Sequence, residues 1–194
     1  MPIHFVLPLI SSLLLYQSGV VGTDNQPKPY EEADAYEVYS ATIPIEGPWR
    51  VENTKSLVIQ SETKGYEMCL RPDEQSEKII GQAISEYVKL NGKTWLLQRQ
   101  FSLKRPYELI AYGELMRYAL EKGGWEDFYK RYPNSGGWIE LSAVGFNADK
   151  MAAVVYMGHY CGGLCGGAGF HVPQKKDGKC APLEWKGETC VWRS

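Results

Sequence analysis

The spacing of apolar residues changes along this chain of 194 residues. After Asp73, apolar side chains recur at positions i, i+4 and i+8, which predicts an amphipathic helix that Asp73 caps and Asn91-Gly92 ends. From residue 138 the pattern becomes strand-like: 138–146 alternates, 147–150 holds turn residues, and 151–156 is a second apolar run. A helical half followed by strands with short connections predicts an α+β fold.

The remaining segments fill in this prediction. Helices are also expected from Tyr30 to Pro44, over 115–120 and over 125–132, and strands over 57–59, 95–101 and 107–112. We expect a single domain over 30–194, with an antiparallel meander in its C-terminal third and several helices from the N-terminal half packed on one face. Residues 23–29 are polar and contain two prolines, which predicts a linker.

The first 22 residues predict an export signal. They contain no Asp, Glu, Lys or Arg, and the mostly apolar run 3–15 is too short to cross ~30 Å of hydrocarbon as a helix. Small residues follow it, so we expect a signal peptide over 1–22, cleaved after Gly22 or Val20, although its start lacks the usual Lys or Arg. The mature chain is then secreted or periplasmic, without a transmembrane segment.

Charge and composition exclude other classes of protein. The chain has 21 Lys+Arg against 23 Asp+Glu, whereas nucleic-acid binding requires clustered basic residues. A hydrophobic fraction of 44% with 23% charged residues excludes a disordered chain. A domain of this size buries enough apolar surface to fold without disulfides, so disulfides are not required for its folding.

Cysteine pairing is expected in an exported protein. The five cysteines are Cys69, Cys161, Cys165, Cys180 and Cys190. Cys161 and Cys165 are separated by Gly162-Gly163-Leu164, which allows a turn tight enough for a bridge. Cys190 then pairs with Cys69 or with Cys180, and the other remains a free thiol.

The segment 161–169 is rich in glycine and is expected to form a rigid loop whose glycines adopt positive φ. A thioredoxin-type redox site has two residues between its cysteines and opens a helix, whereas this segment has three and no helical pattern. A zinc site from His159, Cys161, Cys165 and His171 matches no common spacing. A phosphate site formed by the glycines of this segment lacks the known fingerprints; these are Gly162, Gly163, Gly166, Gly167 and Gly169. No metal or cofactor is predicted.

Other candidates are weaker. His159 and His171 flank the segment and have the residue type that titrates near neutrality. Ser142 lacks the glycine turn of a hydrolase nucleophile, and Glu140 and Glu184 would form an acid–base pair only if the sheet brought them together. The tryptophans with their neighbouring tyrosines suit a carbohydrate or peptide groove, although such residues more often pack in a core. The candidates for the groove are Trp125, Trp138, Trp185 and Trp192.

A set of motifs resembles a recurring pattern in exported bacterial proteins that are described as hypothetical. The motifs are Tyr132-Pro133-Asn134-Ser135-Gly136-Gly137, Val144-Gly145-Phe146-Asn147, Val155-Tyr156, His159, Cys161-Gly162-Gly163-Leu164-Cys165-Gly166-Gly167, Lys175-Lys176-Asp177-Gly178-Lys179 and Trp192-Arg193-Ser194. The resemblance is strongest over 129–194 and implies export and a single domain, but no activity.

One departure from this pattern bears on the cysteines. The similar proteins tend to have tryptophan after Lys-Asp-Gly-Lys, where this chain has Cys180. The resemblance therefore implies that Cys180 is the free thiol and that Cys69 pairs with Cys190, with Cys180–Cys190 as the local alternative.

The functional hypothesis is an exported, disulfide-stabilised protein without catalytic activity that binds an envelope protein or a glycan. Its expected surface is the segment 161–169 with its flanking histidines, and the candidate residues are His159, His171, Gly162, Gly163, Gly166 and Gly167. The alternatives are a small enzyme, either a thiol–disulfide oxidoreductase that uses Cys161 and Cys165 or a hydrolase, and a zinc-binding protein.

Overall fold

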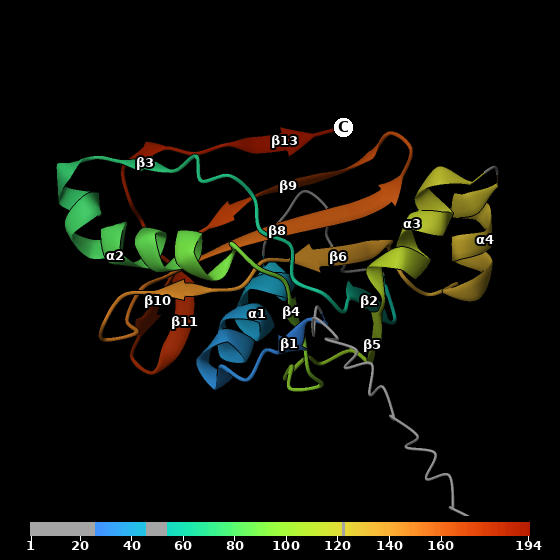
Figure 1. Ribbon diagram of the computed structural model, residues 1–194, viewed down its shortest axis with the longest axis horizontal. Coiled ribbons are helices and arrows are strands. Elements are labelled where there is room, and N and C mark those ends of the chain that lie inside the picture. Colours follow the sequence, from blue (N-terminus) through green and yellow to red (C-terminus); the bar gives the residue numbers. More distant parts are fainter. Residues whose placement is uncertain (1–25, 46–53, 122) are drawn as a thin grey trace, which may run out of the picture.

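The computed structural model describes residues 26–45, 54–121 and 123–194 (Figure 1). The expected signal peptide lies outside these residues. The helices are α1 (Ala33–Ile45), α2 (Glu74–Leu90), α3 (Tyr112–Leu120) and α4 (Gly124–Arg131). As the sequence predicts, the Asp73 carboxylate caps α2 by accepting a hydrogen bond from the Ser76 N–H over 2.8 Å, and Asn91 ends the helix. None of the described helices is both long and apolar enough to cross a membrane.

A mixed sheet forms the centre of the molecule, and its strand order is β13-β9-β8-β6-β2-β5. The strands are β2 (Leu57–Gln60), β5 (Tyr107–Ile110), β6 (Trp138–Leu141), β8 (Ala153–Gly162), β9 (Cys165–His171) and β13 (Val191–Arg193), with β7 (Gly145–Phe146) paired to β8. β2 pairs in parallel with β5 and β6, whereas β6, β8, β9 and β13 are antiparallel. The antiparallel C-terminal part of an α+β fold is therefore confirmed.

Three two-stranded sheets surround this centre. They are β1 (Lys28–Pro29) with β4 (Trp95–Leu96), β3 (Arg71–Pro72) with β12 (Gly187–Glu188), and β10 (Pro173–Lys176) with β11 (Lys179–Pro182). The final strands therefore do not all continue one meander. The expected linker also differs, because Lys28–Pro29 pair with Trp95–Leu96 and so belong to the folded domain.

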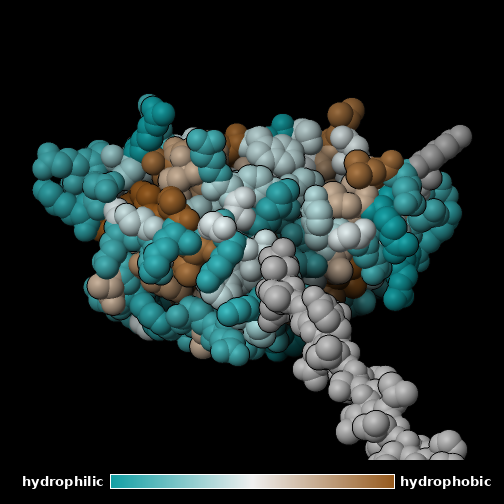
Figure 2. All heavy atoms as spheres, viewed as in Figure 1, coloured by the Kyte–Doolittle hydropathy of each residue, from teal (hydrophilic) through white to brown (hydrophobic). Residues whose placement is uncertain are grey.

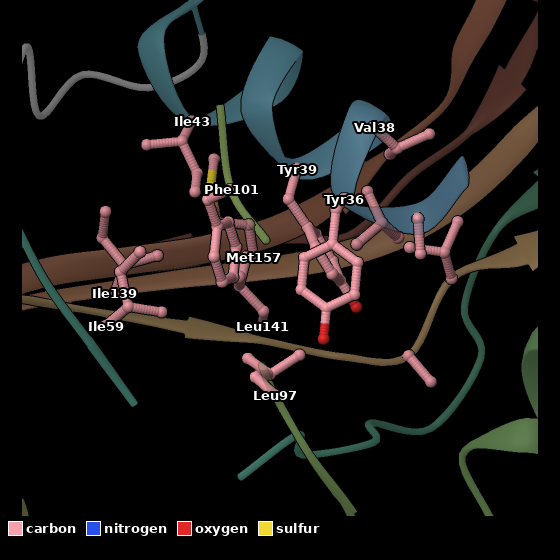
Figure 3. Packing of buried hydrophobic residues seen from close by; sticks show 14 of the residues in the cluster. Tyr36, Val38, Tyr39, Ile43, Ile59, Leu97, Phe101, Ile139, Leu141 and Met157 are labelled. Atoms are coloured by element: carbon pink, nitrogen blue, oxygen red, sulfur yellow. The ribbon is translucent and has the colours of Figure 1, made fainter. Parts of the chain in front are cut away.

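Helices cover both faces of the central sheet, so the expectation that they pack on one face is wrong. α1 packs Tyr39 and its neighbours on Ile59, Leu141 and Met157 (Figure 3). On the opposite face, α2 packs on alternate residues of β8 and β9, and α4 packs on Val58 and Trp138. The physical reason is that β6 is buried along its whole length, so both of its faces need cover.

The glycine-rich segment 161–169 also differs from expectation, because it is strand rather than loop. β8 runs to Gly162 and β9 begins at Cys165, so only Gly163 and Leu164 form the turn of the hairpin. None of the segment's glycines has a positive φ. Pairing with β8 on one side and β13 on the other keeps these glycines extended.

Two disulfides join the cysteines. Cys69 is bonded to Cys190, with their Cα atoms 6.0 Å apart, and Cys161 to Cys165, with their Cα atoms 5.0 Å apart. Cys180 is a free, half-buried thiol, so the Cys180–Cys190 alternative is wrong. This is the pairing that the resemblance implied.

Candidate functional site

The residues expected to form a presented surface are mostly hidden. His159 is 5% exposed, and Gly166 and Gly167 are buried in β9. Gly162 is half-buried and Gly163 is exposed at the turn. This part of the hairpin therefore offers only its tip to a partner.

The two histidines do not form a pair. His159 lies opposite Gly167 on β9, whereas His171 lies opposite Val155, which precedes His159 by four residues on β8. Burial lowers the pKa of His159 to about 4. The expectation that His159 titrates near neutrality is therefore wrong. The other zinc candidates, Cys161 and Cys165, are consumed in a disulfide.

Other sequence candidates separate in the same way. β6, which carries Glu140, pairs with β2 and β8, so Glu184 is not its cross-strand neighbour. Trp125 and Trp138 stack on each other with ring centroids 4.6 Å apart, and Trp138 belongs to the core. Trp185 packs against the buried residues that α2 shares with β8 and β9. Trp192, by contrast, is 41% exposed on β13.

Trp192 belongs to a group of aromatic residues on one face of the central sheet, at the side where β13 is the edge strand. α2 and the α3–α4 pair lie at opposite ends of this face, and between them the extended segment after β2 crosses the strands (Figure 1). Figure 2 shows this face, with pale, weakly polar residues across its middle. We call the group the aromatic platform; it consists of Tyr66, Tyr156, Tyr160 and Trp192.

The rings of the platform contact one another directly. Tyr66 stacks on Tyr156 with a centroid distance of 4.0 Å and an interplanar angle of 24°. The Trp192 Nε1–H donates a hydrogen bond to the Tyr156 hydroxyl over 3.2 Å, and the Trp192 and Tyr160 centroids are 5.9 Å apart. Tyr156 is buried, whereas Tyr66 and Tyr160 are half-buried, so rings from three chain segments reach the surface together.

Gly158 lets the Tyr160 ring lean along the sheet instead of standing on it. A Cβ on Gly158 would lie 3.3 Å from Cε2 of Tyr160, so the ring occupies the space above this glycine. At Gly166 a Cβ would lie 2.8 Å from the backbone oxygen of His159 and 3.5 Å from Cη2 of Trp192, so this glycine allows the close approach of β8 while the Trp192 ring lies in contact above it. Trp192 is 41% exposed, and Tyr66 and Tyr160 are half-buried, so each of these residues is partly accessible to solvent.

A buried carboxylate, that of Glu140, fixes two tyrosines of the platform by hydrogen bonds. Glu140 is 2% exposed, and its Oε1 accepts hydrogen bonds from the hydroxyls of Tyr66 and Tyr160. Its Oε2 lies 3.5 Å from Nζ of Lys64, whose side chain is 44% exposed. Burial, followed by the hydrogen bond to Glu140, raises the pKa of Tyr66 well above its ordinary value.

The long-range disulfide connects the two segments that supply the outer rings. Cys69 follows Tyr66 by three residues, and Cys190 precedes Trp192 by two. The bond therefore restricts the movement of the crossing segment relative to β13. Preorganisation of this kind lowers the entropic cost of binding.

A separate hollow of about 490 Å³ lies between the start of α1 and the C-terminal half of α2. Tyr30, Trp95 and several charged residues line it. Its charged side chains are Glu31, Glu32, Glu86 and Lys150, and Lys150 pairs with Glu32 over 2.9 Å. None of the residues of the aromatic platform lines this hollow.

Sequence reasoning missed most of this site. Trp192 and Glu140 were candidates in other arrangements, whereas Lys64, Tyr66 and Tyr160 were not identified. The available signal was the alternation Tyr156, Gly158, Tyr160, which places a glycine between two rings on one face of a strand.

Comparisons with protein-family models, curated proteins and solved structures found no match to this chain. A functional conclusion therefore rests on the chemistry of the site itself.

Proposed function

We propose that the protein is exported and disulfide-stabilised, has no catalytic role, and binds a glycan on the aromatic platform. The observation that carries the proposal is the group of partly exposed rings of Tyr66, Tyr160 and Trp192. Glu140 fixes Tyr66 and Tyr160 by hydrogen bonds, and Trp192 is held by its hydrogen bond to Tyr156.

The chemistry of a sugar matches such a surface. A pyranose ring has an apolar C–H face and polar hydroxyls at its edge, and an aromatic face attracts C–H groups through its negative quadrupole. Tyrosine and tryptophan supply rigid contact area at a low entropic cost, because each has only two side-chain torsions. The exposed Lys64 ammonium lies beside the Tyr66 ring and can donate to the sugar hydroxyls.

Export is part of the proposal and has its own support. The uncharged apolar N-terminus predicts a signal peptide, and two disulfides are typical of proteins outside the reducing cytosol. Envelope and extracellular polysaccharides are accessible to a protein in that location.

The redox alternative has weaker support. A catalytic cysteine pair usually lies at a helix N-terminus, which lowers the pKa of the attacking thiol. Cys161 and Cys165 instead close the tip of a β-hairpin, where the Tyr129 hydroxyl donates a hydrogen bond to the Cys161 carbonyl over 2.9 Å. This environment favours a structural clamp.

The test is co-sedimentation of the mature protein with insoluble polysaccharides, together with titration of soluble oligosaccharides. Peptidoglycan, chitin and cellulose serve as the insoluble probes. We expect retention on at least one of them, with release by the matching oligosaccharide. Absence of binding to every glycan tested, by a protein that shows a cooperative unfolding transition, would overturn the proposal.

A further inference from the structure

Lys64 occupies a defined position at the edge of the platform. Its backbone N–H donates to the Leu141 carbonyl over 3.0 Å, which fixes the crossing segment on β6. Its Nζ lies 5.0 Å from the ring centroid of Tyr66 and 5.8 Å from that of Tyr112. Two rings therefore hold the ammonium group by cation–π contacts.

The two charges at this site differ in their access to solvent. Glu140 is buried, and both of its oxygens have partners on the protein. Lys64 is 44% exposed and has three N–H donors, while its contact with Glu140 is 3.5 Å long. What the platform presents to a ligand is therefore a positive charge beside aromatic rings.

We infer that the ligand of the platform is an acidic glycan, whose sugar ring lies on the aromatic rings and whose carboxylate binds the Lys64 ammonium. This inference rests on the proposed function and specifies its ligand class. A lysine is a point charge that suits a carboxylate without demanding one bidentate geometry. A ligand carboxylate can accept charge-assisted hydrogen bonds from the N–H donors of Lys64 that do not face Glu140, whereas a neutral sugar offers only uncharged hydroxyl acceptors.

A carboxylate on a sugar has two chemical sources that the test separates. In a uronic acid it is attached to the ring, and in a muramic acid it lies on a lactyl ether. The first probe is trigalacturonate, and its methyl ester is the matched neutral probe. The second is an N-acetylmuramic acid disaccharide, compared with the N-acetylglucosamine disaccharide that lacks the lactyl group.

The experiment measures the affinity of the mature protein for these four probes by calorimetry, at low and at high salt. We expect one acidic probe to bind at least about tenfold more tightly than its neutral partner, and salt to weaken that preference. Lys64→Gln should remove the preference and Lys64→Arg should keep it. Lys89→Gln, at an exposed lysine on α2, should leave it unchanged.

The outcomes distinguish the inference from the function on which it rests. If acidic and neutral probes bind equally and salt has no effect, the acidic-ligand inference is wrong, while glycan binding stands. If none of the four probes binds but an insoluble polysaccharide retains the protein, the acidic-ligand inference alone is wrong. If the protein binds none of these glycans, both the inference and the proposed function fall. The salt dependence of the wild-type protein keeps the test decisive even if Lys64→Gln impairs folding by leaving Glu140 without its cation.

Discussion

Tyr160 donates a hydrogen bond to Glu140 over 3.2 Å from the neighbouring strand, and Tyr66 donates to the same carboxylate oxygen from a segment that crosses the sheet. One buried acceptor therefore sets the positions of two rings that are far apart in the chain. Because a carboxylate left without its donors is costly in a protein interior, this arrangement resists local rearrangement. The platform is built as a rigid surface.

Replacement of Glu140 by glutamine tests this arrangement. Glutamine keeps one acceptor oxygen but loses the charge and turns an amide N–H₂ group toward Lys64. We expect Glu140→Gln to lower the free energy of unfolding by about 2 kcal/mol. We also expect a lower pKa of Tyr66, because the hydrogen bond to a charged acceptor that helps to raise it is lost.

Denaturant unfolding and ultraviolet titration of tyrosine measure these two effects. Glu184→Gln is the matched control, because Glu184 is exposed, and it should change the free energy of unfolding by less than about 0.5 kcal/mol. Equal stabilities of the two variants would show that Glu140 does not support the platform.

Gly158 supplies the space for the Tyr160 ring. A methyl group at this position would lie 3.3–3.4 Å from Tyr160 and from Cβ of Ala168. We expect Gly158→Ala to cost about 1–3 kcal/mol in unfolding free energy and to weaken glycan binding, because the ring has to move away from Glu140. In Gly163→Ala, the control at the hairpin turn, the methyl group would meet no atom within 4 Å. A Gly158→Ala protein that matched this control in both measurements would contradict the packing described.

The two disulfides should differ in their contribution to stability. The Cys69–Cys190 bond closes a separation of 121 residues, whereas Cys161–Cys165 closes a separation of four. In the chain-entropy model the longer loop contributes about 4–5 kcal/mol and the shorter one considerably less. Denaturant unfolding of the double serine variants measures both values. A larger loss in Cys161→Ser with Cys165→Ser would contradict this order.

Alkaline pH should destabilise the fold steeply. Burial is the main cause that raises the pKa of nine of the 13 tyrosines: Tyr30, Tyr36, Tyr39, Tyr66, Tyr87, Tyr129, Tyr132, Tyr156 and Tyr160. The unfolded chain releases these protons near pH 10 while the folded chain keeps them. The protonated tyrosines therefore make their full contribution to the free energy of unfolding below about pH 10, and this contribution falls as the pH rises further.

Each tyrosine that stays protonated in the fold lowers the free energy of unfolding by about 1.4 kcal/mol per pH unit in this range. Guanidinium unfolding at pH 8 and at pH 11 measures the fall. The same unfolding free energy at both values would mean that the tyrosines ionise freely in the folded protein.

The sequence predicted the elements that depend on local patterns. Asp73 and Asn91 mark the ends of α2 because their side chains bond the helix ends directly. The glycine-rich strand β9 was missed because no local signal shows that β8 and β13 pair with it on both sides. The alternating pattern over 138–146 likewise suggested one solvated face, whereas α1 and α4 bury β6 from opposite sides.

The site was harder to predict than the fold. Glu140 has no feature in the sequence that separates it from a solvated strand carboxylate. Its role depends on Tyr66, 74 residues away in the chain, and on a crossing segment whose path the sequence does not reveal. Trp192 was one of four candidate tryptophans, and only its place on the outermost strand distinguishes it.

The affinity of a Trp192→Ala protein for a bound glycan tests the central claim most directly. Val191→Ala is the matched control, because Val191 lies on the same strand, is 53% exposed and alternates to the opposite face of the sheet. We predict that Trp192→Ala weakens binding at least about tenfold while Val191→Ala leaves it unchanged. Equal affinities of the two folded variants would show that the glycan does not bind on the aromatic platform.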